Sequence, residues 1–170
     1  MNERSGNRVC IRSLQSSDLT YTLRWRNDPR SRFWFKTNAV IEQASHLAWF
    51  QRYQFEAKEF MFFVETIDGA SPVGQGGIYN VDQSRGDAEV GRFLSDPELR
   101  GKGLFREGLG LIVQYAFDDL GLESVYLEVM SNNDRAVRLY RSLGFCDTGE
   151  REHMLHMRLS RDRFAAHCSM

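Results

Sequence analysis

Three consecutive segments with strand character constrain the fold of this chain more than any other feature. The first, residues 59–69 (EFMFFVETIDG), is β-rich and closes on Asp68-Gly69, a pair typical of a hairpin turn. Residues 71–81 (SPVGQGGIYNV) supply the returning strand, whose glycines predict a bulge or a close approach of the backbone to another group. Residues 87–95 (DAEVGRFLS) supply the third strand of this β-meander.

Helical and strand patterns on both sides of the meander predict a mixed α/β fold. A strand and two helices precede it, and a long helix, a strand, a second helix and a closing pair of strands follow it. The resulting order, β-α-α-β-β-β-α-β-α-β-β, fits neither a doubly wound sheet nor a barrel. Outside the meander we expect strands at residues 9–13, 124–130, 144–150 and 153–159, and helices at residues 17–28, 41–54, 103–120 and 132–144.

Length and composition bound the class of protein. With 170 residues, 42% hydrophobic and 26% charged, the chain is predicted to form one domain over residues 1–170, with flexible tails at residues 1–8 and 161–170. A net charge of −1 provides no field that attracts nucleic acid or an acidic membrane, and no apolar run is long enough to span a bilayer. We therefore expect a cytoplasmic protein without a nucleic-acid or membrane partner. Its 3 cysteines predict neither a disulfide framework nor a metal site.

The sequence Arg100-Gly101-Lys102-Gly103, directly before a helical pattern, is typical of an anion-binding loop. A P-loop has a different spacing and a following serine or threonine, and the dinucleotide fingerprint has glycine where Arg106 stands. The general physics holds without either template, because backbone N–H groups and the positive end of a helix dipole favour a pyrophosphate. A solvated turn with incidental basic residues is the alternative interpretation of this stretch taken alone.

A second motif lies in the stretch LEVMSNNDRAVRLYRSLGF, where Asn133, Ala136, Tyr140, Gly144 and Phe145 match the pattern N-x-x-A-x-x-x-Y-x-x-x-G-F. Together with the glycine loop, this motif resembles the two signatures of the GNAT superfamily of N-acetyltransferases. The resemblance implies a mixed, mostly antiparallel twisted sheet of about six to seven strands flanked by about four helices. It also implies acetyl-CoA as co-substrate, without a metal. The cofactor-binding residues that it implies are Phe93, Leu94, Arg100, Gly101, Lys102, Gly103, Leu104, Phe105, Arg106 and Asn133.

Phe105 departs from the family loop, which normally has glycine or alanine at this position. A ring that pointed into the loop would crowd a pyrophosphate. Helical spacing instead places Phe105 on the apolar face shared with Leu109 and Ile112, and its backbone N–H then stays free for phosphate. By resemblance, the backbone of Phe93 and Leu94 pairs with the pantetheine arm like an added strand, and one of their N–H groups polarises the thioester oxygen.

Acetyl transfer to an amine requires a deprotonated amine, a polarised thioester carbonyl and a proton for the departing thiolate. The resemblance implies direct attack by the amine, without a covalent acyl-enzyme, and it places Tyr140 at the position of the general acid. An ordinary tyrosine pKa of about 10 keeps such a hydroxyl protonated at neutral pH. Glu128 is the first candidate for the base and Glu89 the second, and solvent could also take the amine proton. Packing and surface roles are the alternatives for these residues.

The segment LRWRNDPRSRFWFK combines basic residues, a single acid and interleaved aromatic residues. A solvated helix face explains part of this pattern, and an acceptor with phosphates and a ring to stack explains the rest. The segment resembles nucleotide-sugar N-acetyltransferases, above all the enzymes of the pseudaminic-acid pathway that use a UDP-linked 4-amino sugar. The substrate-binding residues implied in this way are Trp25, Arg26, Asn27, Arg30 and His46.

Other acceptors are compatible with the same motifs. A protein N-terminus, as used by ribosomal-protein acetyltransferases, is the runner-up. A catalytically silent protein that binds acetyl-CoA is a third interpretation. Cationic aminoglycosides fit less well, because they would prefer an acidic pocket to this basic segment. A homodimer is compatible with each of these interpretations.

Overall fold

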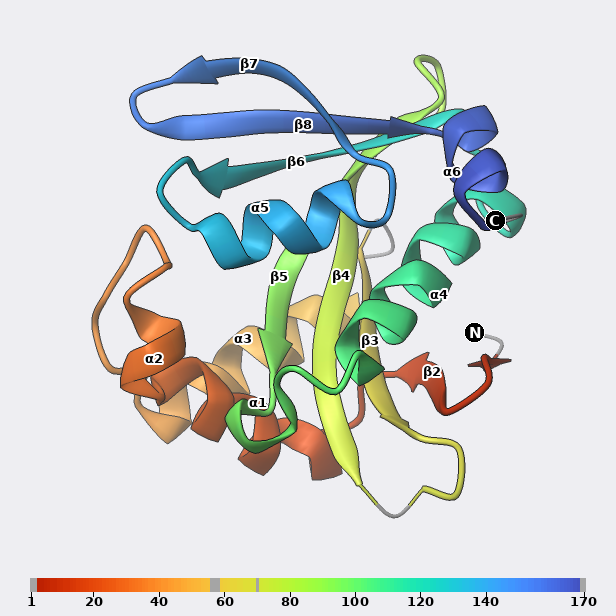
Figure 1. Cartoon of the computed structure of the whole chain (residues 1–170). Helices are drawn as coiled ribbons and strands as arrows, with labels where there is room; N and C mark the ends of the chain where they lie inside the picture. Colours follow the sequence, from red (N-terminus) through yellow and green to blue (C-terminus); the bar gives the residue numbers. More distant parts are fainter. Residues whose placement is uncertain (1–2, 56–58, 70, 169–170) are drawn as a thin grey trace.

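The computed structural model describes residues 3–55, 59–69 and 71–168, and a twisted sheet of eight strands forms its centre (Figure 1). Neighbouring strands follow the order β1-β2-β3-β4-β5-β6-β8-β7. The predicted meander is confirmed as β3, β4 and β5, and the closing pair is a hairpin whose second strand lies next to β6. The strands are β1 (Arg4–Ser5), β2 (Val9–Ser13), β3 (Phe60–Thr66), β4 (Pro72–Asp82), β5 (Asp87–Ser95), β6 (Ser124–Met130), β7 (Cys146–Arg151) and β8 (Met154–Ser160).

Helices cover both faces of the sheet and form two separate hydrophobic clusters with it. The larger cluster joins one face to α4 and α5, and the smaller one joins the other face to α1 and α3. We call these faces the α4 side and the α1 side. The helices are α1 (Leu19–Asn27), α2 (Pro29–Arg32), α3 (Gln43–Phe55), α4 (Leu104–Asp118), α5 (Asp134–Arg141) and α6 (Arg161–Cys168), with 3₁₀ turns at Ser16–Asp18 and Pro97–Leu99.

Strand β3 separates the two clusters. Phe62 and Val64 pack on the α4 side, whereas Met61 and Phe63 pack on the α1 side. This alternation follows from strand geometry, which turns successive side chains to opposite faces. All four side chains are buried, which explains why this part of the sequence is an uninterrupted apolar run.

The parallel neighbours β5 and β6 pair over only part of their length. Their register begins with Asp87 opposite Ser124 and ends with Glu89 opposite Tyr126. Beyond this point the strands diverge (Figure 1). All other neighbouring strands in the described residues are antiparallel. The sheet therefore opens after Glu89, between the remaining residues of β5 and β6.

The glycines of β4 make room for aromatic rings. A Cβ atom at Gly74 would lie 2.6 Å from Phe105 Cδ2, and one at Gly76 would lie 2.7 Å from Phe93 Cδ1. The pairing of β4 with β5 also shifts its register here, as a β-bulge requires. Both effects expected of these glycines, a bulge and a close approach of the backbone, are confirmed.

The described residues form eight strands and six α-helices, more than the sequence predicts. The additional elements β1 and α2 are short and have no apolar residues, and the apolar residues of the short α6 are mostly consecutive, so none of the three gives a periodic signal. Two of them, β1 and α6, fall within the tails at residues 1–8 and 161–170 that the sequence predicts to be flexible. Arg4 pairs with two aspartates at the end of α4, and Arg161 donates hydrogen bonds to backbone carbonyls nearby. These contacts hold β1 and the start of α6 against the end of α4.

Some general features bear on function. Among the described residues, no helix has the length and apolar character needed to cross a membrane. In the same part of the chain, histidine, cysteine and acidic side chains form no group that could hold a metal ion. Cys10 and Cys146 are free thiols, and the side chain of Cys168 lies outside the described residues.

Candidate active site

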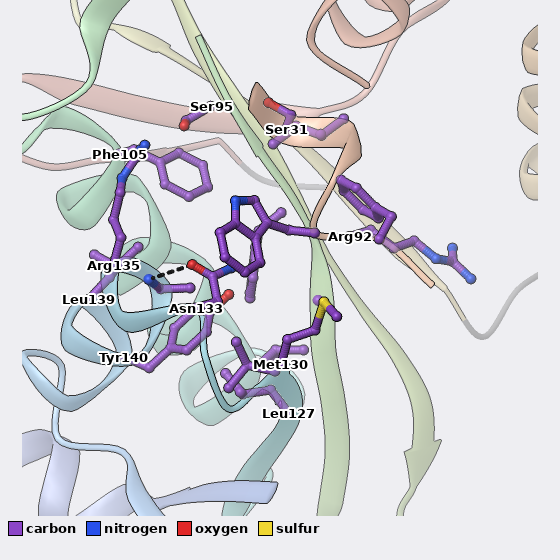
Figure 2. A pocket seen from close by; sticks show the side chains of 18 of the residues that line it. Ser31, Arg92, Ser95, Phe105, Leu127, Met130, Asn133, Arg135, Leu139 and Tyr140 are labelled. Atoms are coloured by element: carbon purple, nitrogen blue, oxygen red, sulfur yellow. Dashed lines mark hydrogen bonds between the residues drawn. The ribbon is translucent and has the colours of Figure 1, made fainter. Parts of the chain in front are cut away.

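A cleft of about 1040 Å³ lies where β5 and β6 diverge (Figure 2). Its walls come from these two strands, from α5, from the loop before α4, and from α2 with the segment after it. The predicted site residues in this lining are Arg26, Arg30, Glu89, Phe93, Leu94, Arg100, Gly101, Gly103, Phe105, Arg106, Glu128, Asn133 and Tyr140. Those outside the lining are Trp25, Asn27, His46, Lys102 and Leu104.

Strand β5 presents a free backbone edge to the cleft. Beyond Glu89, its β6 side has no strand partner among the described residues, and this stretch includes Phe93 and Leu94. Arg92 has a φ of 54°, a left-handed conformation at the bulge where the strand turns. An extended ligand can pair with such an edge as an added strand. The geometry therefore suits the pantetheine arm of CoA.

The loop before α4 has the geometry of an anion site. Gly101 and Gly103 have φ values of 80° and 76°, which favour glycine, and α4 begins directly after them. The first N–H groups of a helix have no acceptor within it, and they form the positive end of its dipole. Arg8 braces the loop through a 3.0 Å hydrogen bond to the Lys102 carbonyl and an ion pair with Glu107. A pyrophosphate therefore fits at this helix start.

The Phe105 ring packs on the sheet and does not fill the loop. It meets the Phe93 ring edge-on, with centroids 6.3 Å apart, and it occupies the space over Gly74. The ring belongs to the main core, as helical spacing predicts, although these neighbours come from β4 and β5 rather than from α4 itself. Backbone donors need no particular side chain, so the departure from the family loop does not prevent phosphate binding.

Tyr140 reaches the cleft from α5. Its ring lies between those of Phe93 and Phe145, at centroid distances of 5.9 and 6.0 Å. Burial raises the pKa of its hydroxyl, which has no hydrogen-bond partner among the described residues. Asn133 accepts a 3.3 Å hydrogen bond from the Ala136 N–H, and this cap fixes the start of the helix that carries Tyr140 (Figure 2). A protonated hydroxyl is thus available to a ligand.

Glu89 and Glu128 lie on the opposite side of the sheet from Tyr140. Their strand neighbours Val90 and Leu127 belong to the cluster on the α4 side, as does Tyr140 itself. Strand alternation therefore turns both carboxylates to the α1 side. Because the sheet is open between β5 and β6, the cleft connects the hydroxyl on one side with the carboxylates on the other.

Both carboxylates have protein partners. Glu128 Oε2 lies 3.1 Å from Lys36 Nζ, and Oε1 lies 3.4 Å from Nδ1 of His156 on the neighbouring strand β8. Glu89 accepts hydrogen bonds from the Tyr79 hydroxyl at 3.1 Å and from an asparagine amide of β4 at 2.8 Å. Either carboxylate could take a proton from an amine in the cleft.

Two predicted basic residues of the cleft have polar partners. Arg30 pairs with Asp28 at 2.8 Å and with Glu98 at 3.2 Å, so acids compensate its charge. Arg100 donates a 2.7 Å hydrogen bond to Ser31 Oγ, and burial lowers its pKa. These contacts tie α2 to the loop before α4.

The structure does not bring Trp25, Asn27 and His46 to the cleft, where the sequence predicts them. Trp25 is fully buried, and its indole N–H donates to Asp96 at 3.0 Å. Asn27 makes two 2.8 Å hydrogen bonds with the backbone of the segment before α3. The Nε2 atom of His46 lies 2.8 Å from Thr22 Oγ1, and burial lowers the pKa of the imidazole. All three side chains therefore stabilise the packing of α1 and α3.

Several cleft residues on the α1 side carry no site prediction from the sequence. Lys36, Tyr79 and Arg92 line the cleft, and His156 contacts Glu128. Lys36 belongs to the basic segment, and strand alternation offers a signal for Tyr79. His156 could be found only from the pairing of β6 with β8, which places it directly opposite Glu128.

Comparison with known proteins adds an independent line of evidence. A family model described as an acetyltransferase (GNAT) domain matches residues 8–146. Spermidine N(1)-acetyltransferase of Escherichia coli (strain K12) is 31% identical over 152 residues, which are 88% of this chain and 78% of that protein. The spermine/spermidine N(1)-acetyltransferase of Bacillus subtilis (strain 168) is 33% identical over 72 residues, 42% of this chain and 47% of that protein.

Solved structures share the fold. Spermidine N-acetyltransferase from Vibrio cholerae in complex with CoA and spermine superposes with a TM-score of 0.80 at 21% identity, covering 92% of this chain and 98% of that one. Apo FdhC, described as a nucleotide-linked sugar GNAT, superposes with a TM-score of 0.85 at 18% identity, covering 97% and 93%. The open sheet, the glycine loop and the family match agree with one another. The chain belongs to the GNAT family and is an acetyl-CoA-dependent N-acetyltransferase.

Proposed function

We propose that this enzyme acetylates the amino group of a nucleotide-linked amino sugar, which enters the cleft from the α1 side. The proposal rests on the side chains that form the cleft wall on that side. It presents the cationic side chains of Arg26 and Lys36 together with the rings of Trp34 and Phe35. Guanidinium and ammonium groups suit phosphates, and aromatic rings suit a base or sugar ring.

Acetyl-CoA, which supplies the acetyl group as a thioester, fits the α4 side. The N–H groups that follow Gly101 and Gly103 would bind the pyrophosphate, and the free edge of β5 at Phe93 and Leu94 would bind the pantetheine arm. One N–H of this edge would also polarise the thioester oxygen. The opening of the sheet lets the two substrates meet from opposite faces.

Tyr140 is the proposed proton donor. Transfer forms a bond between the amine nitrogen and the acetyl carbon and breaks the carbon–sulfur bond, so the amine loses one proton and the sulfur gains one. Burial raises the pKa of Tyr140, which keeps its hydroxyl protonated at neutral pH. Because this hydroxyl has no partner among the described residues, donation to the sulfur breaks no existing hydrogen bond.

Glu128 is the first candidate to accept the amine proton, and Glu89 is the second. Glu128 contacts His156, a partly exposed side chain that could pass the proton to solvent. Glu89 accepts hydrogen bonds from the neutral donors of Tyr79 and an asparagine, and within the described residues it contacts no histidine that could pass a proton to solvent. The geometry therefore favours Glu128.

A polyamine is the second candidate acceptor. The Escherichia coli relative at 31% identity is a spermidine N(1)-acetyltransferase, and the two carboxylates of the cleft could bind cationic amines. However, Glu128 is already paired with Lys36, so a polyamine would compete with a protein cation for this group. This competition makes the nucleotide-linked acceptor the better match to the cleft.

Release of free thiol from acetyl-CoA tests the proposal. UDP- and dTDP-linked amino sugars, spermidine, spermine, and peptides with free N-termini are offered in separate reactions. We expect kcat/KM for a nucleotide-linked amino sugar to exceed that for each polyamine by about tenfold or more. Turnover of polyamines alone would establish the second candidate, and turnover of peptides alone would exclude both.

A further inference from the structure

One pair of arginines on α1 and α2, Arg26 and Arg32, has no acidic partner among the described residues. Nη1 of Arg26 and Nε of Arg32 are buried without a hydrogen-bond partner, and neither side chain forms an ion pair within the described residues. Other arginines of the same two helices are paired, Arg24 with Asp96 at 2.9 Å and Arg30 with a carboxylate at 2.8 Å. The acids of this region therefore compensate the exposed Arg24 and Arg30 and leave the partly buried Arg26 and Arg32 uncompensated.

Contacts with the following segment fix the orientation of Arg26. Its Nη2 donates a 2.7 Å hydrogen bond to the Thr37 carbonyl, and its guanidinium carbon lies 4.2 Å from the centroid of the Phe35 ring. Arg26, Phe35 and Trp34 all line the cleft. A guanidinium held in this way has a fixed orientation, which lowers the entropy cost when a ligand binds the part of it that lines the cleft.

The two neighbouring positive charges of Arg26 and Arg32 favour the binding of an anion. Burial, and after it the charge of Arg32, lower the pKa of Arg26. Arginine nevertheless keeps its proton in proteins, so two positive charges stay close together in a partly buried place. Removing a charge partly from water without an acidic partner is unfavourable, and an oxoanion between such groups offsets that cost.

We propose that Arg26 binds a phosphate group of the acceptor, with Arg32 as a second positive charge and Phe35 as an adjoining wall. This inference rests on the proposed function, since it names the group by which a nucleotide-linked acceptor is held. A diphosphate fits best, because it offers several oxygens to planar guanidinium groups. The subsite lies on the α1 side and is distinct from the glycine loop at 101–103.

Calorimetric titration of UDP and of inorganic pyrophosphate into CoA-saturated protein tests this subsite, because CoA blocks the glycine loop. We expect Arg26→Gln to weaken the Kd for UDP by about tenfold or more, and Arg32→Gln by about threefold. The matched control is Arg52→Gln, which removes the same charge from an exposed position of α3 and should keep the wild-type Kd. Arg26→Lys keeps the charge without the planar fork, so its Kd should lie between those of wild type and Arg26→Gln.

Several results would overturn the subsite: no binding of UDP to the CoA-saturated wild type, an unchanged Kd in Arg26→Gln, or equal weakening in Arg52→Gln. Binding of pyrophosphate that depends on Arg26 supports recognition of phosphate. Uridine is titrated in the same way, and binding of uridine without binding of pyrophosphate would contradict it. The Kd for CoA reports whether each variant is folded. Should Arg26→Gln fail to fold, Arg26→Lys carries the test.

The same experiment separates this inference from the proposed function. If nucleotide-linked sugars are not acetylated while UDP binding still depends on Arg26, the acceptor assignment fails and the phosphate subsite stands. If these sugars are acetylated with the same KM by wild type and Arg26→Gln, the subsite fails and the acceptor assignment stands.

Discussion

The α4 side and the α1 side of the cleft offer different kinds of groups to their ligands. On the α4 side the groups proposed to bind acetyl-CoA are backbone groups, namely the N–H groups after Gly101 and Gly103 and the free edge of β5. On the α1 side they are side chains, among them Arg26 and Lys36 of the basic segment and Glu128, which is far from that segment in the sequence. The loop between α2 and α3 reaches the sheet, where Lys36 meets Glu128.

This difference determines how each side responds to sequence change. A backbone site tolerates a new side chain as long as that side chain finds space elsewhere, as Phe105 does over Gly74. A side-chain site depends on the direction of every residue. We therefore expect substitutions on the α4 side to affect acetyl-CoA, and substitutions on the α1 side to affect the acceptor. The predictions below test this division, from the largest expected effect to the smallest.

Tyr140→Phe should have the largest effect, because it removes the proton donor while the ring keeps its place between two aromatic neighbours. We expect kcat to fall by about 100-fold, within the range for general acids, and the Kd for CoA to stay within about twofold. Steady-state kinetics and calorimetry give these values. Tyr126→Phe, outside the cleft lining, is the matched control. Unchanged turnover in Tyr140→Phe would remove this residue from the mechanism.

Glu128→Gln should lower kcat by about tenfold or more at neutral pH, because the amide cannot accept the amine proton, and Glu89→Gln by less. Affinity for CoA should not change, since both carboxylates lie on the α1 side. Glu150→Gln, at an exposed position of β7, controls for the loss of one negative charge. A larger effect of Glu89→Gln would exchange the roles of the two residues.

Gly101→Ala should raise the KM for acetyl-CoA by about tenfold, equivalent to one weakened charge-assisted hydrogen bond, and leave the KM for the acceptor unchanged. The cause is strain, since an added Cβ meets no atom within 4 Å but must adopt a φ of 80°. Gly121→Ala provides a close match, with a φ of 68° and equally open space. Both variants should lose about 1 kcal/mol of unfolding free energy, and only Gly101→Ala should lose affinity. Equal KM values for acetyl-CoA in Gly101→Ala and Gly121→Ala would contradict the assignment of the loop to acetyl-CoA.

His46→Phe should have the smallest effect on catalysis, with kcat changed less than about twofold, because His46 lies outside the cleft. Its effect is on stability. Burial lowers the pKa of folded His46 below 6.5, so the unfolded chain takes up the proton first as pH falls. The free energy of unfolding should therefore decrease below about pH 7 in wild type, by at most about 1.4 kcal/mol per pH unit for this group. Denaturant unfolding should show a weaker decrease of the unfolding free energy in His46→Phe than in wild type. The control His153→Gln keeps His46 and should show the same decrease as wild type.

Sequence patterns predicted the parts of the molecule whose conformation depends on residues close together in the sequence. The meander, α4 and α5 follow from periodicity, and the loop follows from Gly101 and Gly103, whose left-handed backbone favours glycine. Trp25 and Arg26 show where such patterns fail. They are adjacent in α1, and residues of a helix turn by about 100° per position, so Trp25 enters the core while Arg26 lines the cleft. The contact of His156 with Glu128 depends on strand order, which no local pattern encodes.

Direct competition between acceptors tests the central claim, the division of the cleft into a backbone site for acetyl-CoA and a cationic side-chain site for a phosphate-bearing amine. A UDP-linked 4-amino sugar and spermidine are mixed in equal amounts with limiting acetyl-CoA, and mass spectrometry quantifies both products. We predict that acetylated nucleotide sugar exceeds acetylated spermidine by about tenfold or more, and that Arg26→Gln reduces this ratio. Acetylspermidine as the main product, with a ratio that Arg26→Gln does not change, would contradict the account.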